Sequence, residues 1–166
     1  MIIRKETVAD IDAITQVTRA AFKTLEINDN TEQFIIKALR QSGALAISLV
    51  AEIDQQIVGH IAFSPVKISD GASGWYGLGP VSVLPKLHRQ EIGKALIKKG
   101  LSLLQDANAQ GCALVGYPDY YKRFGFKNYE KLIYEGIPPE VFLILPFTEN
   151  IPQGIVKFDE GFAAKE

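Results

Sequence analysis

The 166-residue sequence is poor in several residue types that would define a class of protein. Its single cysteine, Cys112, has no partner, so neither an intrachain disulfide nor a multi-thiolate metal site can form, and we expect a buried, inert thiol. No run approaches the roughly 18 apolar residues of a membrane span. The net charge is −1, so we expect no nucleic-acid partner recruited by the overall field, and any anion site must be local.

The composition that is present fits one globular domain. Hydrophobic residues make up 47% of the chain and charged residues 22%, and we see no repeat, linker or low-complexity segment. The start, "MIIRKETVAD", has acids too early for a secretion signal. We therefore expect a single domain over residues 1–166 that works in the cytoplasm.

Periodicity along the chain predicts a mixed α/β sheet with helices packed on it. Thr7 and Asp10 resemble a capping box before a helix, and Thr31 and Gly43 are suited to begin and end a second one. We expect the last residues, "GFAAKE", to fray. The expected order is a strand at 1–5, helices from 11 and 31, a hairpin over 45–68, a strand at 75–84, a helix at 92–109, a strand at 112–116, a short helix at 118–125, and strands within 131–137 and 141–147.

The strand at 75–84 contains an unusual interruption. Pro80 removes one ladder donor, and Gly77 and Gly79 weaken the same region. The apolar neighbours favour a central strand that bulges away from the strand bearing Cys112, although an edge strand would also accommodate the proline. A bulge of this kind leaves backbone groups facing a gap, where an extended ligand carrying amides could pair with them.

The segment "HRQEIGK", residues 88–94, leads from this strand into a helix. Free amides of a first helical turn and the positive end of the helix dipole favour phosphate or pyrophosphate. Arg89 and Lys94 add charge, and Gly93 permits close backbone approach. A solvated basic helix start is the alternative. The patterns GxxxxGK[ST] and GxGxxG are both missing here, which argues against nucleotide hydrolysis and dinucleotide redox chemistry.

These residues carry a resemblance. "VSVLPKLHRQEIGKAL" resembles the acetyl-coenzyme A (acetyl-CoA) signature of the GNAT acetyltransferases, in which [QR]xxGx[GA] follows a strand of VxVxP type, and "YYKRFGF" resembles their YxxxGF segment. "VGHIAFSPV", "LGPVSVLP", "GCALVGYP" and "FDEGF" are similar to a bacterial branch of predicted N-acetyltransferases. The resemblance implies the GNAT fold, a mostly antiparallel sheet splayed between its fourth and fifth strands and flanked by helices.

The resemblance also implies a reaction and its residues. Acetyl-CoA would be the cosubstrate, without a metal, and a primary amine would attack it directly in a ternary complex. Tyr121 would protonate the departing thiolate, with Tyr120 as the alternative. Backbone groups of Val81, Ser82 and Val83 would pair with the pantetheine arm, and the pyrophosphate would lie in the turn formed by His88, Arg89, Gln90, Glu91, Ile92, Gly93 and Lys94.

Two residues depart from the family pattern. His88 stands where Gln or Arg is preferred, which is a mild change because histidine can donate to phosphate. Glu91 stands where glycine is preferred. If that position has positive φ, glutamate costs roughly 1 kcal/mol or somewhat more, and its charge opposes a phosphate. We expect weakened cofactor affinity rather than lost binding.

Several assignments stay open at this stage. The general base could be Glu52, His60 or a water chain, and acidic Glu26, Asp29 and Glu32 lie where the family usually builds its acceptor site and could attract a cationic amine. A CoA-binding sensor without turnover and an enzyme using a longer acyl thioester are the alternative functions. Similar folds often dimerise, so a homodimer is left open.

Overall fold

The computed structural model describes residues 1–23 and 30–166, and six strands of this part form the main sheet. The sheet order is β1-β2-β3-β5-β6-β8, and its pairs are antiparallel except for the parallel pair β5–β6, which confirms the prediction of a mostly antiparallel sheet. The strands are β1 (Ile2–Lys5), β2 (Ile47–Ile53), β3 (Gln56–Pro65), β5 (Trp75–Val83), β6 (Gly111–Val115) and β8 (Phe142–Pro146). Glu26 and Asp29 lie outside the described residues.

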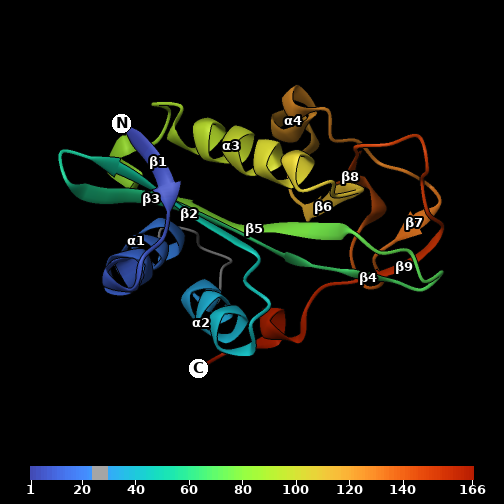
Figure 1. Ribbon diagram of the computed structural model, residues 1–166, viewed down its shortest axis with the longest axis horizontal. Coiled ribbons are helices and arrows are strands. Elements are labelled where there is room, and N and C mark those ends of the chain that lie inside the picture. The colour runs from blue at the N-terminus through green and yellow to red at the C-terminus, as the bar shows by residue number, and fades with distance from the viewer. Residues whose placement is uncertain (24–29) are drawn as a thin grey trace.

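Helices cover both faces of the main sheet (Figure 1). α3 and α4 lie on one face, and α1 and α2 lie on the other. The helices are α1 (Ile11–Lys23), α2 (Glu32–Ser42), α3 (Ile92–Asp106) and α4 (Pro118–Tyr121), with 3-10 turns η1 (Val8–Asp10), η2 (Pro85–Leu87), η3 (Lys122–Phe124), η4 (Pro139–Val141) and η5 (Glu160–Ala163). No helix among residues 1–23 and 30–166 is long and apolar enough to cross a membrane.

The predicted helix signals are present in the structure. The backbone N–H of Thr7 donates to Asp10 Oδ2 at 2.7 Å, which completes one half of a capping box before α1. Gly43 ends α2 in the left-handed conformation with φ of 81°. Local sequence therefore marks where α1 begins and where α2 ends.

The core lies mainly between α3 and the sheet. Ile92, Leu96 and Leu104 of α3 are buried against it, as expected from their helical spacing. Cys112 on β6 is fully buried in the same cluster, and burial raises the pKa of its thiol well above the usual range. The prediction of a buried, inert thiol thus agrees with its position.

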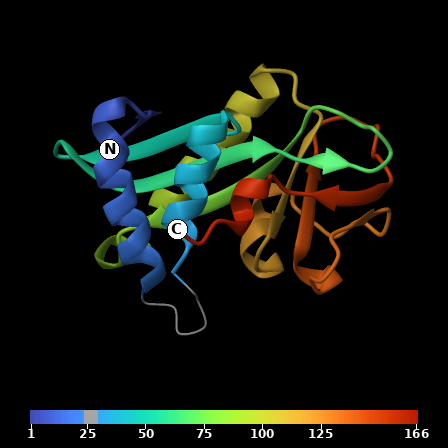
Figure 2. The same ribbon diagram turned by 90° about the horizontal axis from the view of Figure 1, so that it is seen from below.

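The C-terminal segment begins in the 3-10 turn η5, so the expectation that "GFAAKE" frays was wrong for Gly161–Ala163. Gly161 of η5 is buried, and a Cβ built there would lie 3.0 Å from Leu39 Cδ2 of α2. Figure 2 shows this segment beside α2. Before it, β9 (Gly154–Lys157), which the sequence analysis missed, joins β4 (Lys67–Ile68) and β7 (Leu132–Ile133) in a second sheet. The fraying prediction failed because the residues that bury this segment are distant in sequence.

Candidate functional site

The main sheet opens between β5 and β6, its fourth and fifth strands. The two strands pair only from Trp75 and Gly111 to Gly77 and Ala113. β5 continues to Val83 along β3, whereas β6 continues to Val115 along β8. The β3–β5 register shifts between the pairs Ile61–Val81 and Phe63–Leu78, so β5 has one extra residue in the segment that contains Pro80. The predicted bulged central strand is confirmed.

Strand alternation decides which backbone groups face this opening. Leu84 N–H donates to Val58 O of β3 at 2.9 Å, so the residues of even number here, including Ser82, turn their backbone groups toward β3. Val81 and Val83 therefore turn theirs toward the opening. The side chain of Ser82 points to α1, where its Oγ lies 3.3 Å from Thr18 Oγ1. Of the three residues predicted to pair with pantetheine, alternation leaves two in a position to do so.

A cavity of about 550 Å³ lies beside the start of α3, and we call it the α3 cavity. Phe22 and Val81 line this cavity and also line a second cavity, which is described below. Tyr120 and Arg123 also line it. All but one of the predicted cofactor-binding residues line it, Gln90 being the exception: Val81, Ser82, Val83, His88, Arg89, Glu91, Ile92, Gly93 and Lys94. The structure thus brings the strand and the helix start together around one space.

The turn into α3 has the strained backbone that the sequence suggested. Glu91 is the residue before the helix and has φ of 64° and ψ of 16°, and Arg89 also has a positive φ, 69°. The Glu91 side chain is 74% exposed, and its Oε1 lies 3.8 Å from Lys94 Nζ. His88 Nε2 donates to Val83 O at 2.9 Å, which fixes the turn to β5. The expected conformational cost of glutamate at position 91 depended on a positive φ, and the structure has one there.

A second cavity, of about 400 Å³, lies at the other side of the opening, and we call it the aromatic cavity. It shares Phe22 and Val81 with the α3 cavity. Tyr121 lines the aromatic cavity, whereas Tyr120 lines the α3 cavity. The two neighbouring tyrosines are thus divided between the two spaces.

Tyr121 is held at the end of β6 by packing on Gly116. A Cβ built at Gly116 would lie 2.5 Å from Tyr121 Cε2, so only glycine allows the ring to lie this close. Burial raises the pKa of Tyr121 to about 12, with smaller contributions from Tyr120 and Cys112. Its hydroxyl is therefore protonated at neutral pH and can donate a proton.

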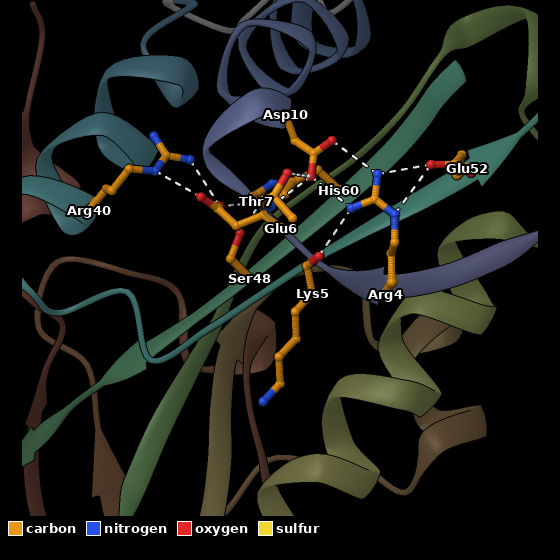
Figure 3. Close-up of polar contacts among 9 residues, drawn as sticks. All are labelled: Arg4, Lys5, Glu6, Thr7, Asp10, Arg40, Ser48, Glu52 and His60. Carbon is orange, nitrogen blue, oxygen red and sulfur yellow. Dashed lines mark hydrogen bonds and ion pairs between the residues drawn. The ribbon is translucent and has the colours of Figure 1, made fainter. Parts of the chain in front are cut away.

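His60, one of the two residues proposed as a base, lies in a closed polar network (Figure 3). The side chain is fully buried, and its Nε2 is 2.7 Å from Ser48 Oγ, which in turn donates to Glu6. Arg40 binds both carboxylate oxygens of Glu6 at 3.0 Å. Burial lowers the pKa of His60 to about 4, and the charge of Glu6 offsets this only in part. His60 lines neither cavity, so it is excluded as the base.

Glu52 is also occupied elsewhere. Arg4 Nη2 lies 2.9 Å from its Oε1, and the same guanidinium binds Asp10 (Figure 3). Glu52 is on β2, two strands away from β5 in the sheet, and it lines neither cavity. The sequence left three candidates for the general base, Glu52, His60 and water. The positions of Glu52 and His60 leave water as the candidate.

The aromatic cavity contains residues that the sequence analysis did not select. Tyr134, Phe158 and Phe162 line it, and all three come from the C-terminal third of the chain. Glu32, which was considered as an acceptor-site residue, lines it as well. The "FDEGF" stretch was the available signal, but it carried no chemical assignment because its partners are distant in sequence.

A sheet opened between two strands, with a basic helix start at one side and a half-buried tyrosine at the other, defines an acyltransferase class of fold. The chain belongs to the GNAT family, because the family model described as an acetyltransferase (GNAT) domain matches residues 44–128. The uncharacterized N-acetyltransferase YhbS of Escherichia coli K12 is 32% identical over 128 residues, which cover 76% of this chain and 74% of that protein.

Two solved structures extend the comparison over almost the whole chain. A GNAT family acetyltransferase from Brucella melitensis in complex with acetyl-CoA has 47% sequence identity and a TM-score of 0.87, with 97% of each chain covered. YhbS from Escherichia coli in complex with CoA has 28% identity and a TM-score of 0.89, covering 98% of this chain and 91% of that one.

Proposed function

We propose that this protein transfers the acetyl group of acetyl-CoA to a primary amine by direct attack in a ternary complex. The observation that carries the proposal is the opening between β5 and β6, at which the α3 cavity and the aromatic cavity share Phe22 and Val81. An extended thioester entering from one cavity can meet an amine entering from the other. The ligands of the two related structures, acetyl-CoA and CoA, support this use of the opening.

The α3 cavity is proposed to hold the cofactor. Backbone groups of Val81 and Val83 that face the opening pair with the amides of pantetheine, as in an added strand. The amides at the start of α3 and the side chains of Arg89 and Lys94 receive the pyrophosphate, which the helix dipole also favours. His88 donates from Nε2 to Val83 O and so holds the turn against β5.

The reaction needs a neutral amine, a stabilised oxyanion and a protonated leaving group. The amine nitrogen attacks the thioester carbon, and a backbone N–H of β5 facing the opening stabilises the oxygen that becomes negative. When the C–S bond breaks, the sulfur takes a proton from the Tyr121 hydroxyl, and the amine nitrogen gives its excess proton to water. The products are the amide and free CoA, and Tyr121 regains its proton from solvent.

Replacement of Tyr121 by phenylalanine tests the assignment of the acid. We expect kcat in Tyr121→Phe to fall by about 10²-fold or more, which is within the usual range for loss of a general acid. Acetyl-CoA affinity, measured by calorimetry, should change little because the ring and its packing on Gly116 remain. Turnover is followed as release of free thiol from acetyl-CoA with a panel of primary amines.

Two further tyrosine variants make this test specific. Tyr129→Phe removes a hydroxyl that lines neither cavity and should retain full turnover. Tyr120→Phe examines the alternative acid, whose hydroxyl lies on the cofactor side near Gly93. Full turnover in Tyr121→Phe with a loss in Tyr120→Phe would transfer the role to Tyr120. Acetyl-CoA binding without thiol release for any amine would instead favour a CoA-binding sensor.

A further inference from the structure

The aromatic cavity has one wall made of three contiguous rings. The centroid of the Phe158 ring lies 5.0 Å from that of Tyr134 and 5.3 Å from that of Phe162. These separations are those of directly packed aromatic pairs. All three rings line the cavity, so a ligand there meets a continuous aromatic surface rather than isolated side chains.

This wall is fixed by contacts that do not involve a ligand. A Cβ built at Gly77 would lie 2.5 Å from Phe158 Cε1, so the Phe158 ring lies directly on the β5 backbone at the point where β5 and β6 separate. The Tyr134 ring packs on buried Phe142 with centroids 5.5 Å apart. The 3-10 turn that carries Phe162 is held on α2 through Gly161. The wall is therefore preformed.

The other residues that line the aromatic cavity are mostly apolar, and the charge among them is negative. Phe22, Tyr117 and Tyr121 contribute further rings. Among the described residues that line the cavity, Glu32 is the one acid and no lysine, arginine or histidine is present. A carboxylate and several aromatic faces both attract a cation. The volume, about 400 Å³, lies within the range of small-molecule sites.

We propose that the acceptor is a small primary amine carried on an aromatic or branched apolar group. This inference rests on the proposed function. The apolar group lies against Tyr134, Phe158 and Phe162, and the amine end points to the opening beside Val81. Glu32, which lines the same cavity, favours entry of the protonated amine, which gives one proton to water before it attacks. A polyamine is disfavoured because its additional ammonium groups would lose water against the aromatic wall without a partner.

Three amines test the class, with thiol release from acetyl-CoA as the assay. 2-Phenylethylamine presents a ring, ethanolamine is a matched short polar amine, and spermidine carries several charges. We expect kcat/KM for 2-phenylethylamine to exceed that of each of the others by at least about tenfold, the lower end of what an apolar pocket contributes to discrimination. Equal or higher kcat/KM for ethanolamine or spermidine overturns the inference.

Two substitutions connect this preference to the cavity. Phe162→Leu should raise KM for 2-phenylethylamine at least about threefold and narrow its advantage over ethanolamine, whereas Phe147→Leu, outside the cavity, should not. Glu32→Gln should raise KM for the amine with kcat within about twofold, and exposed Glu140→Gln is its control. An unchanged preference in Phe162→Leu that still binds acetyl-CoA contradicts the assigned wall.

Calorimetry separates failure of this inference from failure of the proposed function. If the protein binds no CoA thioester, both fail. If it binds acetyl-CoA and releases thiol with another primary amine, but 2-phenylethylamine neither turns over nor binds saturably to the acetyl-CoA complex, the inference fails and the proposed function stands. Saturable binding or turnover of 2-phenylethylamine with the expected preference supports both.

Discussion

Glu91 allows a prediction in which stability and cofactor affinity change for separate reasons. This residue precedes α3 with φ of 64°, and its carboxylate lies at the turn proposed to hold the pyrophosphate. Replacement by glycine removes both the strained side chain and the charge. Replacement by glutamine removes the charge alone and retains a side chain in the left-handed conformation.

The stability effect follows from the backbone. A left-handed residue with a side chain costs about 1–2 kcal/mol, and glycine removes this cost. Glycine also destabilises the folded state by about 0.5–1 kcal/mol, because its unfolded chain has greater conformational freedom. We therefore expect Glu91→Gly to raise the free energy of unfolding by about 0.5–1 kcal/mol. Glu91→Gln should leave the free energy of unfolding nearly unchanged, because the strain remains.

The affinity effect follows from the charge. Two unit charges about 8 Å apart in water interact by about 0.5 kcal/mol, so two or three phosphate charges give about 1–1.5 kcal/mol. This corresponds to a Kd for acetyl-CoA about five- to tenfold lower in both variants at low salt. Lys94, 3.8 Å from the Glu91 carboxylate, offsets little because the pair is exposed.

Calorimetry with acetyl-CoA and thermal unfolding measure the two effects separately. The gain in affinity should shrink as salt rises, because the charges are exposed to solvent and screened. Unchanged or weaker acetyl-CoA binding in both Glu91→Gly and Glu91→Gln would refute the electrostatic reasoning. A lower free energy of unfolding for Glu91→Gly would refute the reasoning about strain.

Two other predictions concern His60 and Gly116. The folded-state pKa of His60, about 4, lies below its unfolded value, so the unfolded chain binds the proton preferentially and stability is lost as pH falls from about 6.5. Denaturation at several pH values should show that this group lowers the free energy of unfolding by about 3 kcal/mol at pH 4. An equally steep loss of stability with falling pH in His60→Gln would contradict this. Gly116→Ala should displace the Tyr121 ring and lower kcat about tenfold or more with acetyl-CoA affinity retained, and unchanged kcat would argue against this placement.

The features that sequence reasoning found are those with local signals. Pro80 within an apolar strand indicated the bulge, and the break in pairing after Gly77 follows from the same region. The basic segment before α3 indicated an anion site, and Glu91 at a glycine position indicated the strained backbone. These inferences need only the chain itself and the geometry of one strand or one helix end.

The features that it missed depend on contacts between distant parts of the chain. Phe158 belongs to the cavity because it packs on Gly77, 81 positions earlier. Glu52 and His60 were reasonable base candidates by residue type, but Arg4 binds the first and the Ser48–Glu6 pair encloses the second. Ser82 could be separated from its two neighbours only once the pairing of β5 with β3 was known. None of these relations has a signal within a short window of sequence.

A crystal structure of the protein with acetyl-CoA tests the central claim most directly. The account predicts pantetheine amides paired with Val81 and Val83 between β5 and β6, the pyrophosphate on the turn before α3, and the thioester sulfur within hydrogen-bond reach of the Tyr121 hydroxyl. Acetyl-CoA bound elsewhere on the protein, or bound with the opening between β5 and β6 left empty, would contradict it.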